Sequence, residues 1–340
     1  MAADGAALAL GDTFMKTILI AYDGSACADA IITELRHAGL PTPLDVHVIA
    51  VEEPFSLPIA DPGQWSAIPS MVPVLPSVAD VQAQLATKAG ATADHAATQL
   101  RAAFPSWTVS SAGEVDSVVR AILLKATAIC ADAIFLGSHS RSAVGRFFLG
   151  SVSHKIAAEA NCSVHICRPH PPFGEAPRVV VAVDGSEAAT AAVHAIIARE
   201  WPSGTVVAAV SVVKSPFGLG EDFDGEYSDE WLRLRLQEPR DLRDGRFASL
   251  EKIAETAHHA LELAGIKAES HTLIGTPKDT LLAWAEEWKA DCIFVGASGT
   301  QHPAEDVFGT VASAISVRAH CSVEIVRVRR SESIANGPAL

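Results

Sequence analysis

The sequence predicts two α/β domains in tandem, each a doubly wound (Rossmann-like) fold around a five-stranded parallel sheet. The first observation is an internal repeat, because ILIAYDGS at residues 18–25 returns as VVVAVDGS at residues 179–186. ADAIFLGSHS at 131–140 likewise returns as ADCIFVGASG at 290–299, in the same order and at nearly the same spacing. The second observation is that short apolar runs alternate with longer helical patterns, which is typical of βαβ units. We therefore interpret the chain as a duplicated module.

In the first copy, five apolar runs predict strands near residues 17–22, 44–51, 107–112, 133–137 and 163–167. Helical periodicity predicts helices near residues 26–38, 80–103, 116–130 and 151–160. The runs are apolar throughout rather than alternating, as in strands that helices cover on both faces. Right-handed crossovers between such strands form an open doubly wound sheet.

The second copy repeats this pattern. Strands are expected near residues 178–183, 205–212, 268–273, 292–296 and 322–327, and helices near residues 187–200, 248–264, 278–289 and 310–319. The first domain is expected at residues 15–170 and the second at 178–330, joined by a proline-containing linker at 171–177 whose prolines cannot continue a helix. Residues 1–14 and 331–340 read as loose extensions, and the first of them lacks the basic start of a signal peptide.

Each copy also carries an insertion after its second strand, at residues 54–80 and 214–247. Loops of this length in compact domains are usually functional or disordered. Both leave from the carboxyl edge of the sheet, where doubly wound folds bind ligands.

Two turns at this edge have the composition of a ligand site. Asp23 and Asp184 each follow the first strand of a copy, where a carboxylate can accept a hydrogen bond from an amine or hydroxyl. The alternative is that these turns only cap the following helix. After the fourth strand, glycines are spaced so that the second group opens a helix whose N–H groups attract an anion. A simple strand-to-helix turn is the alternative there.

The VAVDGS opening and the spaced glycine loop resemble the universal stress protein family over nearly the whole chain, apart from the termini and insertions. The resemblance implies the strand order 3-2-1-4-5 and pairing of the domains through their last strands, which the unpaired edges of those strands also favour. It implies binding of ATP or a related adenine nucleotide, with or without Mg²⁺. The implied contacts to adenine and ribose are Asp23, Val51, Asp184 and Val212. The implied phosphate contacts are Gly137, Gly150, Ser151, Gly296, Gly299, Gly309 and Thr310.

The two copies depart from the family pattern differently. Copy one has Ser140 where the second glycine belongs, but it carries Arg141 and Arg146, which would help to neutralise phosphates. Copy two keeps all its glycines, but has Glu305 and Asp306 in the corresponding stretch. We expect the first domain to bind nucleotide more tightly.

The bulk composition narrows the function. With 26 Lys and Arg against 40 Asp and Glu, the net charge of −14 disfavours nucleic acid and anionic membranes as partners. No CxxC pair occurs among the six cysteines, so we expect reduced, mostly buried thiols in a cytoplasmic protein. No nucleophile–base pair is evident, so no enzyme activity beyond slow ATP hydrolysis is expected.

The sequence therefore favours a nucleotide-responsive stress or regulatory protein that acts on an unidentified protein partner. The intramolecular pseudo-dimer leaves a further homodimer open. One alternative is a stress scaffold that binds no nucleotide and works through its interfaces. The other is a hydrolase or transferase of the doubly wound class.

Overall fold

The computed structural model describes residues 15–54, 77–138, 149–169, 176–214, 240–299 and 308–328. In the segment 240–299, side chains are described from residue 245 onward. Both expected terminal extensions and most of the linker and of the two insertions lie outside these residues.

Strands and helices alternate along the described chain, as expected. The elements of the first half are β1 (Thr17–Ala21), α1 (Ala26–Glu34), β2 (Asp45–Glu52), α2 (Val78–Ala103), β3 (Thr108–Val115), α3 (Val118–Ala128), β4 (Ala133–Gly137), α4 (Ser151–Glu159) and β5 (Ser163–Cys167). Those of the second half are β6 (Arg178–Ala182), α5 (Glu187–Ile197), β7 (Val206–Lys214), α7 (Arg240–Leu263), β8 (Lys267–Gly275), α8 (Pro277–Glu287), β9 (Cys292–Gly296), α9 (Thr310–Arg318) and β10 (Ser322–Val326). All predicted strands are present, with bounds that differ from expectation by a few residues.

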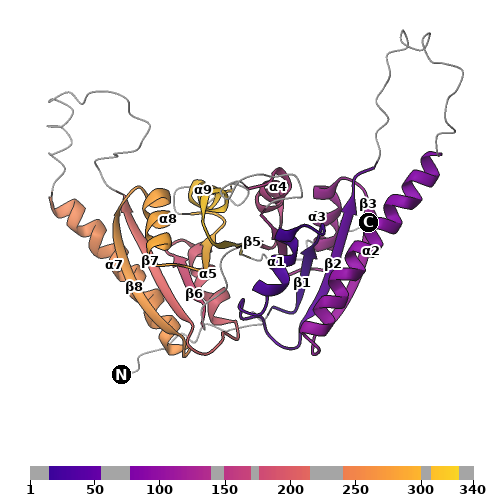
Figure 1. The fold of residues 1–340 in the computed structure, drawn as a ribbon. Helices are drawn as coiled ribbons and strands as arrows, with labels where there is room; N and C mark the ends of the chain where they lie inside the picture. The colour runs from indigo at the N-terminus through magenta and orange to yellow at the C-terminus, as the bar shows by residue number, and fades with distance from the viewer. Residues whose placement is uncertain are drawn as a thin grey trace, which may run out of the picture.

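The strands form one sheet of ten, in the order β3-β2-β1-β4-β5-β10-β9-β6-β7-β8 (Figure 1). Each half has the expected order 3-2-1-4-5 and only parallel neighbours. β5 and β10 pair antiparallel, with His165 directly opposite Glu324. Because these residues hold equivalent places in the two copies, the pseudo-twofold axis passes between them. The predicted pairing of the last strands is confirmed.

Helices cover both faces of this sheet, which explains the continuously apolar strands. One buried cluster lies on the α1 and α2 side and includes Leu100, and a second lies on the α5 and α7 side and includes Leu261. A third, which includes Ile156 and Ile315, runs through both halves beneath α3, α4, α8 and α9. Figure 1 shows α4 and α9 side by side at the centre of the molecule, where they contact each other.

The insertions are shorter than the sequence predicted, because helix occupies one end of each. α2 begins at Val78 rather than residue 80, since Ser77 and Asp80 form a capping box: the Ser77 hydroxyl accepts from the Asp80 N–H at 3.1 Å, and the Asp80 carboxylate accepts from the Ser77 N–H at 3.1 Å. α7 begins at Arg240 rather than residue 248. The residues at its start include Arg and Leu, which have good helix propensity.

All six cysteines are free thiols, as expected: four are buried, Cys27 is half-buried and Cys130 is exposed. Within the described residues, no helix combines the length and the apolarity that crossing a membrane requires.

Candidate functional site

The turn after β1 holds Asp23 at the carboxyl edge of the sheet, where it was expected. Its Oδ1 accepts a hydrogen bond from the Ser25 N–H at 2.9 Å, while the Ser25 hydroxyl accepts from the Ala28 N–H at 3.2 Å and caps α1. Gly24 between them has φ of 72°, a left-handed conformation that favours glycine. Ser25 is therefore the cap of α1, and Asp23 shapes the turn in front of it.

The second copy reproduces this turn. Asp184 Oδ1 accepts from the Ser186 N–H at 2.9 Å, Ser186 caps α5, and Gly185 has φ of 82°. The helix capping that the sequence offered as an alternative for these turns is present: a serine caps each helix, and the aspartate accepts from the N–H of that serine.

The two ends of the glycine loop in the first domain lie next to each other. Gly137 is the last residue of β4 and Gly150 is the N-cap of α4, and the Gly150 N–H donates to the Ser138 carbonyl at 2.8 Å. Ser151 is the first residue of α4. The predicted contacts Ser140, Arg141 and Arg146 lie outside the described residues.

The loop of the second domain closes in the same way. Gly296 ends β9, the Gly309 N–H donates to the Ala297 carbonyl at 2.8 Å, and Thr310 opens α9. A Cβ added at Gly299 would lie 3.0 Å from Asp184 Oδ2, so the structure brings this glycine loop against the turn after β6.

The N-cap glycines are not needed for their backbone angles. Gly150 and Gly309 have φ of −62° and −60°, which any residue adopts. At Gly309, the absence of a side chain provides space, since a Cβ there would lie 3.1 Å from the Ala297 oxygen. Glycine also has no side chain that could cap a helix. The first N–H groups of α4 and α9 therefore stay available for an external acceptor.

The remaining predicted contacts lie deeper in the sheet. Val51 is near the end of β2 and Val212 is in β7, and both are partly buried against the cluster that runs through the two halves. Their place at the carboxyl half of a strand is the expected one.

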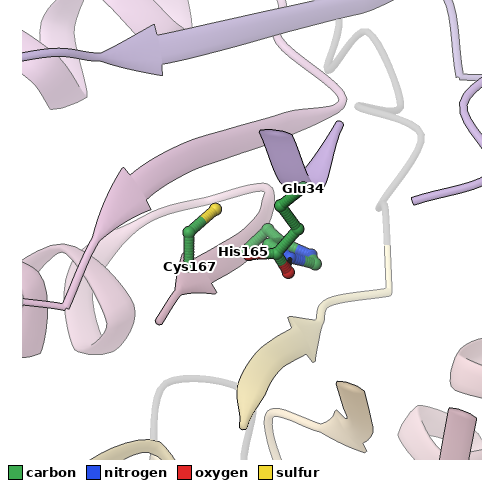
Figure 2. A group of neighbouring side chains, drawn as sticks. All are labelled: Glu34, His165 and Cys167. Atoms are coloured by element: carbon green, nitrogen blue, oxygen red, sulfur yellow. Dashed lines mark hydrogen bonds and ion pairs between the residues drawn. The ribbon is translucent and has the colours of Figure 1, made fainter. Parts of the chain in front are cut away.

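Sequence reasoning missed a second polar cluster, which lies where the halves meet. Glu34, His165 and Cys167 are buried, and their ligand-type atoms lie within 4.8 Å of one another (Figure 2). The signal was present: SVHICR and SVEIVR carry a histidine and a glutamate at equivalent places in otherwise apolar strands.

The fold and these edge loops define a class, the doubly wound α/β proteins with a ligand edge at the carboxyl ends of the strands. Within that class, the universal stress protein family model matches residues 15–168 and 176–327. The chain belongs to the universal stress protein family, and the two matches are its two tandem copies.

Individual proteins and structures are similar to one half or to most of this chain. The universal stress protein MJ0531 of Methanocaldococcus jannaschii is 32% identical over 158 residues, which is 46% of this chain and 84% of that protein. A crystal structure of a universal stress protein from Archaeoglobus fulgidus superposes with a TM-score of 0.58 at 19% identity, covering 92% of this chain and 98% of that one. A family protein from Arabidopsis thaliana, solved with AMP bound, covers 47% of this chain and 97% of its own at 19% identity and a TM-score of 0.31.

Proposed function

We propose that this chain binds an adenine nucleotide of the ATP type at the carboxyl edge of each half-sheet and acts as a nucleotide-responsive regulatory protein. One observation carries the proposal: in both copies, a helix with a glycine N-cap begins beside the residue that follows the fourth strand, β4 or β9. Free N–H groups and the helix dipole at such a place favour phosphate oxygens.

The aspartate turns supply the second half of the site. The contact of Gly299 with Asp184 puts a carboxylate next to the proposed phosphate loop in the second domain. In the first domain, the turn that holds Asp23 is followed directly by α1, whose Cys27 lies against Gly137. A nucleotide that spans aspartate and helix N-terminus would therefore cover the first turn of α1.

Cys27 gives a direct test in the native chain. Cys27 is half-buried, with its Cβ and backbone against Gly137, whereas Cys130 is exposed just past the end of α3, at the opposite edge of the sheet, and serves as a built-in control. We expect ATP with Mg²⁺ to slow alkylation of Cys27 and to leave that of Cys130 unchanged, as read by peptide mass spectrometry. Equal rates at Cys27 with and without ATP, together with no nucleotide released from freshly purified protein, would favour the scaffold instead.

A further inference from the structure

Four charged side chains are buried together where the two halves meet. Each half brings an oppositely charged pair: Glu34 and His165 from the first, Arg199 and Glu324 from the second. Their residues are 4%, 1%, 7% and 1% exposed, respectively. A cavity beside them has a volume of about 10 Å³, room for about one water molecule. These charges must therefore be satisfied by one another.

The hydrogen bonds show that His165 is the central cation. Its Nε2 lies 2.7 Å from Glu34 Oε1, and its Nδ1 lies 2.8 Å from Glu324 Oε2. A carboxylate only accepts hydrogen bonds, so both ring nitrogens must carry protons. The Arg199 guanidinium also bonds both oxygens of Glu324. Within these four side chains, two positive and two negative charges then balance.

Further hydrogen bonds of this network cross between the halves. The Ser322 hydroxyl donates to Glu34 Oε2 at 2.7 Å, and Arg199 Nη1 donates to the Ala38 carbonyl at 2.7 Å. His165 and Glu324 face each other on the pseudo-twofold axis. If like halves paired instead, histidine would face histidine and glutamate would face glutamate, with like charges buried together.

A metal ion does not suit the cluster in Figure 2 in this arrangement. The atoms that could bind a metal already share protons in hydrogen bonds. Glu34 and His165 bond each other directly, and the second ring nitrogen of His165 is bonded to Glu324. Burial raises the pKa of the Cys167 thiol well above its usual value, which keeps the sulfur protonated. The charge is balanced without a metal.

We propose that this network is a proton-held lock between the two domains, in which the imidazolium of His165 holds β5 against β10 and alkaline conditions release it. Buried ion networks often add little net stability compared with apolar packing, but removing one charge from them is costly. Such a network is therefore suited to selecting the pairing of unlike halves and to releasing it when one proton is lost.

The direction of the pH effect follows from His165. Burial lowers the pKa of His165, but the two carboxylates outweigh it and raise the pKa from 6.5 to about 9. The stabilisation is complete below pH 6.5 and is lost as the pH rises through about 9. At one decade per pKa unit, complete deprotonation of His165 lowers the equilibrium constant for the paired state about 300-fold.

Glu324 and the two thiols buried beside the network do not mimic the effect, because their pKa values are displaced away from this window. The pKa of Glu324 is held below its usual value because the Arg199 and His165 charges outweigh burial, and burial raises the pKa of the Cys167 and Cys292 thiols well above theirs. Other ionisable groups that line the cavity are Glu34, His37, Arg199 and Asp291, and Arg168 interacts with Glu34. Of these, only His37 is a histidine, and it serves as the control.

The test compares the pH dependence of stability in the full chain. We expect the urea midpoint of the native protein to fall between pH 6.5 and 9, that of His165→Gln to lose this slope, and that of His37→Gln to keep it. Hydrogen exchange, corrected for its intrinsic pH dependence, should rise at β5 and β10 before it rises at β1. The same slope in His165→Gln as in the native chain would overturn the lock.

A second measurement covers the case in which His165→Gln does not fold. In the native chain, nitrogen NMR of His165 should show both ring nitrogens protonated at pH 8. A neutral His165 ring at that pH would equally refute the proposal.

Discussion

A close approach between α2 and β3 allows a sharp prediction about Gly113 in β3. A Cβ added there would lie 2.2 Å from the Gly90 nitrogen, 2.5 Å from the Ala89 carbonyl carbon and 2.6 Å from the Gly90 Cα in α2. All three atoms are backbone, so none can rotate away. We predict that Gly113→Ala forces α2 off β3.

The magnitude follows from the distance that must open. A 2.2 Å contact has to widen by more than 1 Å to reach an ordinary van der Waals separation, and α2 would carry its buried face, including Ala93 and Leu100, with it. Inserting one carbon into a packed interior costs about 1–3 kcal/mol. A clash against rigid backbone belongs at the upper end, so we expect a loss of about 3 kcal/mol.

The partner glycine provides the control. A Cβ at Gly90 meets no described atom within 4 Å, and Gly90 lies inside a helix. Gly90→Ala should therefore raise the free energy of unfolding by about 0.5–1 kcal/mol. Urea unfolding followed by circular dichroism, at unchanged slope with denaturant, measures both variants. A Gly113→Ala variant as stable as the native chain would refute the close approach of helix and strand.

Three further predictions concern the candidate sites and their supports. In titrations with ATP and Mg²⁺, Gly150→Val should remove more binding than Gly309→Val, because the first glycine loop carries arginines; the reverse order would show that the ranking of the sites is wrong. Arg327→Leu should lower the free energy of unfolding by about 1–3 kcal/mol, since its guanidinium crosses to the Ala157 and Ala158 carbonyls at the end of α4 in the other half; an unchanged thermal midpoint would contradict this. Thiol counting after anaerobic denaturation should give six free thiols, with only the two less-buried ones reacting in the native chain, and fewer than six would argue for a disulfide.

Much of the architecture was predictable because its physical causes are local. β4 (Ala133–Gly137) and β9 (Cys292–Gly296) are apolar at nearly every position, since helices cover both of their faces. The pairing of the last strands followed from their unpaired edges. The start of α2 could also have been found, because Ser77 and Asp80 have capping-box spacing. The start of α7 could not, since its charged residues fit a loop or a solvated helix equally well.

The candidate sites were predicted in part. The turns at Asp23 and Asp184 and the glycines at the helix starts lie where the repeat placed them, because motif order fixes position along a doubly wound sheet. What the repeat could not supply was the reason for each glycine. Gly309 has an ordinary φ and matters through the nearby Ala297 oxygen, and such a contact depends on tertiary packing.

The buried network marks the limit of such reasoning. A histidine or glutamate within an apolar strand, taken alone, indicates only a polar residue that needs a partner. Antiparallel pairing about a pseudo-twofold axis adds a rule, because residues at equivalent places in two copies then face each other at the axis. His165 and Glu324 satisfy it with opposite charges. Their helix-end partners, Glu34 and Arg199, follow no such rule, because each comes within reach through the packing of α1 against β5 or of α5 against β10 within its own half.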